Sequence, residues 1–218
     1  MIRFATVFAA LSLSASAAIA APVPPASAPL PVPAGVYTAD KAHTTLIFRL
    51  NHLGFSNYTA QFAKIDATLT FDPGKPEAST ITASIDTRSL LLPTPPAGFL
   101  DQLLGKDWLD AVAFPQITFQ STKVERTGKN AARISGELSL HGVKHPVVLQ
   151  ATYNGGYAGH PMDPHARIGF SAHGSFKRSD FGIAYGIPAP GTTMGVSDEV
   201  QVSIETEMSG PPLAPAVK

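Results

Sequence analysis

The sequence predicts an all-β protein, built as an antiparallel β-barrel of about eight strands with one short inserted helix. Apolar and polar residues alternate with a period of two in at least eight segments, which is typical of strands that bury one face. Turn-forming residues separate the segments, for example at 72–75, 127–130 and 154–156. Closing the sheet on itself would bury every apolar face and remove exposed edges. A two-sheet sandwich would fit the same periodicity and is the alternative.

The alternating segments are spread along the chain between the two proline-rich ends. Their apolar positions, with one glycine, are Leu46/Phe48/Leu50, Ile65/Ala67/Leu69/Phe71, Ile81/Ala83/Ile85, Ile117/Phe119, Ile134/Gly136/Leu138/Leu140, Val147/Leu149/Ala151/Tyr153, Ala166/Ile168/Phe170/Ala172 and Val200/Val202/Ile204. A closed barrel of about eight strands can hold one small ligand if its inward side chains do not fill it.

The segment from Gly98 to Ala111 breaks the period of two. Its apolar residues follow one another at steps of three and four, which is helical spacing. These residues are Phe99, Leu100, Leu103, Leu104, Trp108 and Leu109. Prolines flank the segment on both sides, so we expect one short helix between the third and fourth strands.

The two ends of the chain differ in composition from the barrel region. Residues 1–20 combine an early Arg3, a short apolar run and a final Ala-Ile-Ala, which predicts a signal peptide cleaved after Ala20. Residues 21–34 carry six prolines and are expected to form an extended linker. We expect the barrel at 35–209 and a flexible tail at 210–218. These features predict a periplasmic protein with no transmembrane segment in its mature chain.

Composition argues against several functions. The 16 basic and 16 acidic residues balance, which argues against a nucleic-acid partner. The absence of cysteine excludes disulfides, zinc-thiolate sites and thiol nucleophiles. The best metal-ligand cluster is His160 and His165 with Asp163, but loop histidines of this kind are more often solvent-exposed. No Gly-x-Ser-x-Gly motif occurs. We therefore assign no metal ligand, no catalytic residue and no cofactor.

Five blocks in chain order carry a resemblance to a known family. They are Tyr37–Asp40 with His43 and Phe48, Gly105–Thr122, Gly136–Val147, Arg178–Ile183 and Val196–Val200. Together they resemble the YceI-like family, secreted bacterial proteins associated with polyisoprenoid binding. The resemblance implies a lipocalin-like barrel with a lipid-binding interior.

The function implied by this resemblance is the binding of one long apolar ligand: a polyisoprenoid, an isoprenoid quinone or a fatty amide. The protein would transport, store or sequester it, without enzymatic activity. Aromatic residues can line a tunnel or pack a core, and the resemblance favours a tunnel. The candidate ligand-binding residues are Phe48, Phe62, Phe71, Trp108, Phe119, Phe170 and Phe181.

Two further expectations concern partners and roles. The alternative function is a hydrolase or isomerase that acts on an isoprenoid-like substrate in the same cavity. Besides the lipid, a second copy of the chain is the candidate protein partner, in a homodimer. Arg178 and Asp180 are expected to stabilise structure rather than to bind a head group.

Overall fold

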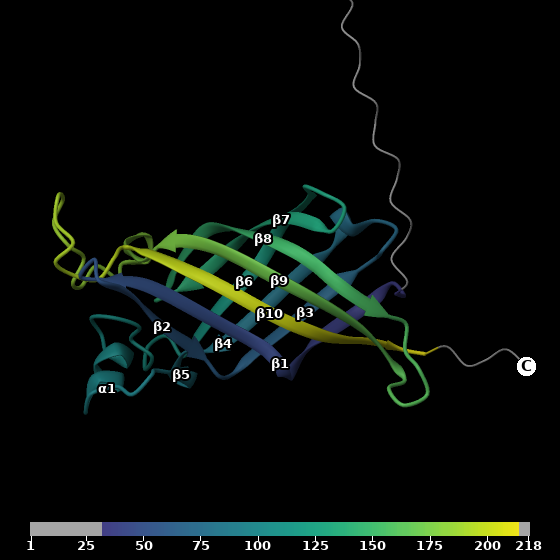
Figure 1. Cartoon of the computed structure of the whole chain (residues 1–218), viewed down its shortest axis with the longest axis horizontal. Helices are drawn as coiled ribbons and strands as arrows, with labels where there is room; N and C mark the ends of the chain where they lie inside the picture. The colour runs from purple at the N-terminus through teal and green to yellow at the C-terminus, as the bar shows by residue number, and fades with distance from the viewer. Residues whose placement is uncertain (1–31, 214–218) are drawn as a thin grey trace, which may run out of the picture.

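The computed structural model describes residues 32–213 and shows an antiparallel barrel (Figure 1). The strands are β1 (Gly35–His52), β2 (Ser56–Phe62), β3 (Ile65–Phe71), β4 (Thr80–Asp86), β5 (Leu90–Leu91), β6 (Gln116–Arg126), β7 (Ala131–Leu140), β8 (Val143–Tyr157), β9 (His165–Lys177) and β10 (Glu199–Pro212). One α-helix, α1 (Phe99–Leu104), and three 3₁₀ turns, η1 (Pro76–Ala78), η2 (Thr87–Ser89) and η3 (Arg178–Phe181), lie between them. None of the helices in this part of the chain has the length and hydropathy to cross a membrane.

Pairing between the first and last strands closes the barrel. Neighbouring strands follow the order β10-β9-β8-β7-β6-β4-β3-β1, and β1 then pairs with β10. This last pairing runs from Thr38 opposite Ser209 to Arg49 opposite Gln201. The ring therefore has eight antiparallel strands, and the predicted barrel is confirmed over the sandwich. Each of the eight alternating segments in the sequence lies in one strand of the ring.

Two strands lie outside the ring and were not predicted. β2 pairs with the second half of β1, and the two-residue β5 pairs with the end of β2. β5 is too short to show any periodicity, so its pairing follows from the position of the chain rather than from its own sequence.

The inserted helix is confirmed but is shorter than its apolar pattern. α1 has six residues and ends at Gly105, whose backbone is extended. Tight turns follow, in which the Trp108 N–H donates to the Gly105 carbonyl and the Ala111 N–H to the Leu104 carbonyl. The pattern over 98–111 thus marks a segment that packs one apolar face on the barrel, although less than half of it is helical.

The folded region extends beyond the predicted domain at both ends. Val32 is buried, and the Tyr37 hydroxyl donates to the Pro33 carbonyl at 2.6 Å. β10 continues to Pro212, which pairs with His165. Backbone pairing and burial therefore include residues that composition alone assigned to a linker and a tail. The predicted signal peptide, residues 21–31 of the linker and residues 214–218 lie outside the described residues.

Two apolar clusters fill the two ends of the barrel. We call them the helix-end cluster and the terminal cluster. The helix-end cluster includes Phe62, Leu90, Ile117, Leu140, Phe181 and Ile183, with α1 and Trp108 packed against it. The terminal cluster includes Val32, Tyr37, Leu69, Phe71, Ala166, Ile168 and Met208. Figure 1 shows that α1 lies at one end of the barrel, while the start of β1 and the end of β10 lie at the other.

Candidate functional site

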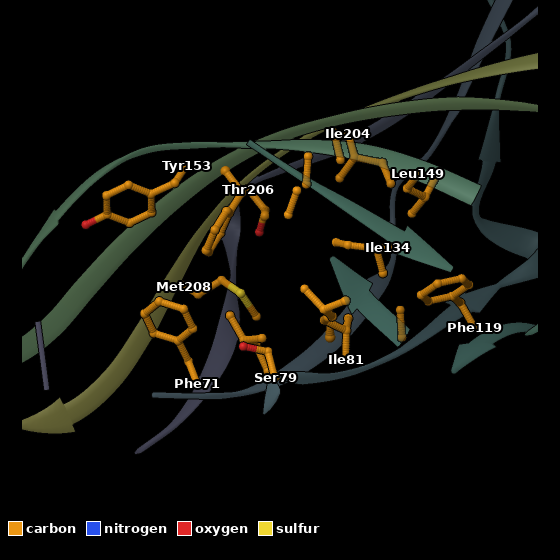
Figure 2. A pocket seen from close by; sticks show the side chains of 18 of the residues that line it. Phe71, Ser79, Ile81, Phe119, Ile134, Leu149, Tyr153, Ile204, Thr206 and Met208 are labelled. Atoms are coloured by element: carbon orange, nitrogen blue, oxygen red, sulfur yellow. The ribbon is translucent and has the colours of Figure 1, made fainter. Parts of the chain in front are cut away.

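A cavity of about 440 Å³ lies inside the barrel, and its wall takes residues from both clusters. This volume falls in the usual range for small-molecule sites, roughly 300–1,000 Å³. Figure 2 shows aliphatic and aromatic side chains converging on the cavity from several strands. Among them are Phe71, Ile81, Phe119, Ile134, Leu149, Ile204 and Met208. The wall is therefore largely apolar.

Small side chains at inward positions create the room for this cavity. Ala67, Ala83, Ala151 and Ala172 line the wall from β3, β4, β8 and β9. Because strand residues alternate between the two faces of a sheet, each alanine stands where a larger residue would fill the interior. The middle of the barrel is therefore left open while its two ends are packed.

The cavity opens where β6 separates from β4. The two strands pair only from Thr82 opposite Gln120 to Asp86 opposite Gln116. Beyond this point the Ile81 N–H donates to the Ser121 hydroxyl, at 2.8 Å. The rest of β6 faces η1, and residues of the β3–β4 connection and the β6–β7 hairpin line the opening, which we call the mouth. They are Pro73, Gly74, Pro76, Glu77, Ser79, Arg126, Lys129 and Asn130.

Few polar atoms interrupt the wall. The Thr44 and Thr206 hydroxyls share a hydrogen bond of 2.8 Å across the β1–β10 pairing. The Ser79 and Tyr153 hydroxyls are buried and have no hydrogen-bond partner among the described residues. Burial raises the pKa of Tyr153, because ionisation would place a charge in an apolar environment. Both hydroxyls therefore lack a hydrogen-bond partner among the described residues.

The structure places three of the seven predicted site residues in the wall: Phe71, Phe119 and Phe170. Phe170 makes edge contacts with Phe71 and Tyr153, with ring centroids 6.5 and 5.6 Å apart. These rings form an aromatic section of the wall toward the terminal cluster.

The other four predicted residues lie in the packed helix end of the barrel and do not line the cavity. Phe48 and Phe62 stack with centroids 5.5 Å apart. Phe181 is fully buried, and Trp108 packs against the same helix-end cluster. Of the four, only Phe48 belongs to an alternating segment, and its inward orientation agrees with that pattern. The position of all four at the helix end of the barrel separates them from the cavity, and the sequence pattern does not encode that position.

The candidate ligand-binding residues predicted from the sequence include no aliphatic residue of the wall and no residue of the mouth. Ile81, Ile134 and Ile204 stand on the inward faces of their strands, so the alternation already contained the signal for them. Ser79 and Lys129 lie in connections, where no periodic signal exists. Only the three-dimensional pairing of the strands brings these two connections together.

Arg178 stabilises the loop that follows η3. Its side chain is 2 % exposed, and its guanidinium lies 5.0 Å from the centroid of the Trp108 ring. It donates to four backbone carbonyls, those of Ile183, Tyr185, Val196 and Ser197. Burial lowers the pKa of Arg178 from its ordinary value. This geometry is that of a structural residue, bonded to carbonyls rather than to Asp180.

In the candidate metal cluster of His160, Asp163 and His165, the Asp163 carboxylate is already bonded to other side chains. The Asp163 carboxylate accepts a hydrogen bond from the Tyr157 hydroxyl at 2.7 Å and one from Arg167 Nε at 2.9 Å. These bonds, Tyr157 first, hold the pKa of Asp163 below its usual value. Residues 32–213 contain no group of three or more side chains placed to hold a metal ion.

Comparison with known proteins adds a family to this geometry. The sequence profile of the YceI-like domain matches residues 37–208. A UPF0312 protein of Pseudomonas savastanoi pv. phaseolicola is 37% identical over 176 residues, covering 79% of this chain and 86% of that protein.

Two solved structures share the barrel. Burkholderia cenocepacia BcnA superimposes with a TM-score of 0.65 at 28% identity, over 78% of this chain and 98% of BcnA. A polyisoprenoid binding domain from Saccharophagus degradans, implicated in plant cell wall breakdown, has a TM-score of 0.59 at 14% identity. That match covers 82% of this chain and 99% of the domain, and at such low identity it bears on the fold alone.

Proposed function

Because the chain belongs to the YceI-like family, we propose that it binds one long apolar lipid in the barrel cavity and transports, stores or sequesters it in the periplasm. The ligand is a polyisoprenoid, an isoprenoid quinone or a fatty amide. The single observation that carries this proposal is the apolar cavity of about 440 Å³ between two packed ends.

The energetics of such a cavity suit an apolar chain. Each CH₂ group moved from water into the wall contributes about 0.8 kcal/mol, so several isoprene units bind well without any polar contact. The packed clusters at either end limit the space available, so selection depends on the length and width of the chain.

The chemistry of the lining favours binding over the alternative of a hydrolase or isomerase. Of the described residues that line the cavity, Glu77 is the one carboxylate, and it stands at the mouth. The wall beyond it presents hydrocarbon and isolated hydroxyls. In our proposal the ligand is held and released without chemical change.

Solvent extraction and mass spectrometry of the purified protein test the proposal directly. We expect one lipid per chain in the parent protein. Ala172→Phe would place a ring in the cavity and should remove the lipid. The matched control is His173→Phe, one residue along β9 on the exposed face, which should retain it. Absence of lipid from the parent protein, together with its failure to bind a fluorescent fatty probe, would refute the proposed function.

The periplasmic location has its own test. N-terminal sequencing of the exported protein should begin at Ala21, because the Ala-Ile-Ala sequence ends the short apolar run at Ala20. A product that retains Met1 would contradict this part of the proposal.

A further inference from the structure

The charged side chains that line the cavity are confined to its mouth. Among the described residues they are Glu77, in the β3–β4 connection, and Arg126 and Lys129, at the β6–β7 hairpin. The wall beyond them is apolar apart from a few hydroxyls. A ligand inside this cavity therefore meets charge at one end only.

The charges at the mouth do not cancel. The Glu77 carboxylate lies 3.9 Å from Arg126 Nε, so these two side chains form an ion pair across the opening. Lys129 takes part in no ion pair and no side-chain hydrogen bond within residues 32–213. The mouth thus carries one cation without a carboxylate, at the point where a bound chain would emerge.

A buried hydroxyl, that of Ser79, also lies at the mouth. Ser79 follows η1 directly, its Oγ atom is buried, and no described residue bonds to it. Figure 2 shows the Ser79 side chain among the residues that face the cavity. A buried hydroxyl without a partner disfavours the folded state. Rotation of the Ser79 side chain toward the cavity would let the hydroxyl donate a hydrogen bond to a ligand oxygen and relieve that cost. An anionic oxygen is the strongest acceptor for it.

We propose that the lipid carries an acidic head group, a carboxylate or a phosphate, at the end of its apolar chain. This inference rests on the lipid-binding function proposed above and narrows its ligand to a polyisoprenoid with an acidic head group, in place of a neutral quinone or fatty amide. Lys129 and the Ser79 hydroxyl hold the head group at the mouth, beside the ion pair of Glu77 and Arg126. The chain extends inward along the apolar wall. The site orients its ligand with the head toward solvent, because charge is available at the mouth and nowhere deeper.

Three probes with one tail isolate the head group: farnesol, farnesoic acid and farnesyl phosphate. Binding of each to the full chain is measured by displacement of a fluorescent fatty probe at low and high salt. We expect at least one of the two acids to bind about fivefold tighter than farnesol at low salt, which corresponds to a single partly exposed ion pair. Added salt should reduce that difference. The two acids distinguish a carboxylate-binding site from a phosphate-binding site.

Lys129→Gln should remove most of the preference for acids, so that the affinities for the two acids fall toward the affinity for farnesol. The matched control is Lys123→Gln, which removes the same charge from β6 where Lys123 pairs with Glu125 at 2.7 Å outside the cavity. Ser79→Ala should also weaken the acids.

The outcomes separate the two proposals. Equal binding of all three probes, or equal effects of Lys129→Gln and Lys123→Gln, would overturn the acidic head group and leave the lipid carrier intact. Failure of every farnesyl probe to bind a parent protein that also purifies without lipid would overturn both.

Discussion

The ring of Phe119 fills the space where a side chain on Gly136 would stand, with Cζ 2.3 Å from the position of an added Cβ. Gly136 lies on β7, next to the β6 strand that carries Phe119, and the Gln120 carbonyl is also only 2.7 Å from that position. The missing side chain therefore lets an aromatic ring form part of the cavity wall. Sheet geometry and cavity shape are coupled at this pair.

Gly136→Ala should destabilise the protein by about 1–3 kcal/mol, because the methyl group meets a ring and a backbone carbonyl that are both held in place. Thermal unfolding measures the effect. Gly128→Ala is the control, since its methyl group would meet Ala131 at an ordinary 3.5 Å. Similar melting temperatures for the two variants would show that β6 and β7 shift readily.

Two phenylalanine-to-tryptophan changes distinguish the cavity wall from the packed end. Phe170 lines the cavity, so Phe170→Trp should keep the fold and weaken lipid binding about tenfold or more. Phe48 stacks on Phe62 in the helix-end cluster, so Phe48→Trp should cost about 1–3 kcal/mol of stability and leave affinity nearly unchanged. Melting temperature and probe displacement are measured on both. The reverse pattern would show that Phe48, and not Phe170, lines the lipid-binding cavity.

The Tyr153 hydroxyl is buried without a partner, so Tyr153→Phe should leave the lipid-free protein equally stable or more stable by about 1 kcal/mol. Stability above pH 10 should change as well. Burial raises the folded-state pKa of Tyr153, so the folded state holds the phenol proton more tightly than the unfolded state does. The free energy of unfolding is therefore unaffected by this ionisation below the unfolded pKa of about 10 and falls as pH rises from there through the folded value.

Urea unfolding of the parent and of Tyr153→Phe between pH 8 and 12 tests the sign of this effect. The variant should lose less stability than the parent over that interval, because it has one fewer buried group to ionise. Tyr37 is present in both proteins, and its pKa is raised first by burial and then by the neighbouring Tyr153. Tyr153→Phe removes the second cause, so the change at Tyr37 acts in the same direction as the loss of Tyr153 itself. A steeper alkaline loss in the variant would contradict the assignment.

Residues just before β1 should contribute to stability, although their composition suggested a dispensable linker. Val32 is buried in the terminal cluster, and the Pro33 carbonyl accepts a hydrogen bond from the Tyr37 hydroxyl. A chain beginning at Gly35 should be less stable than one beginning at Pro31 by roughly 2 kcal/mol or more, from lost burial and a lost hydrogen bond. Equal melting temperatures would show that Val32 adds nothing.

The barrel was predictable because each strand of the ring carries its own alternation, as at Ile81, Ala83 and Ile85 in β4. The alternation states which face a residue occupies but not how far along the barrel it lies. Phe48 and Phe170 both face inward, yet one packs a filled end and the other lines the cavity. Depth depends on the register of all eight strands, which no single segment contains.

The mouth could not be predicted for a related reason. Ser79 and Lys129 belong to separate connections, and they share an opening only because β4 and β6 pair over a short stretch and then diverge. That divergence is set by where each strand ends and by the contact of η1 with the end of β6. Local composition carries no signal for such an arrangement.

The seam between β1 and β10 also governs the order of assembly. Thr38 pairs with Ser209, so the contact that completes the ring joins positions near opposite ends of the described chain. Such distant contacts are slow to form because a long loop must close first. Until β10 is available, β1 lacks the partner that completes the ring, so the inward apolar face is not fully covered. Under the proposed function, a lipid is either enclosed as the last strand docks or admitted afterwards between η1 and the β6–β7 hairpin.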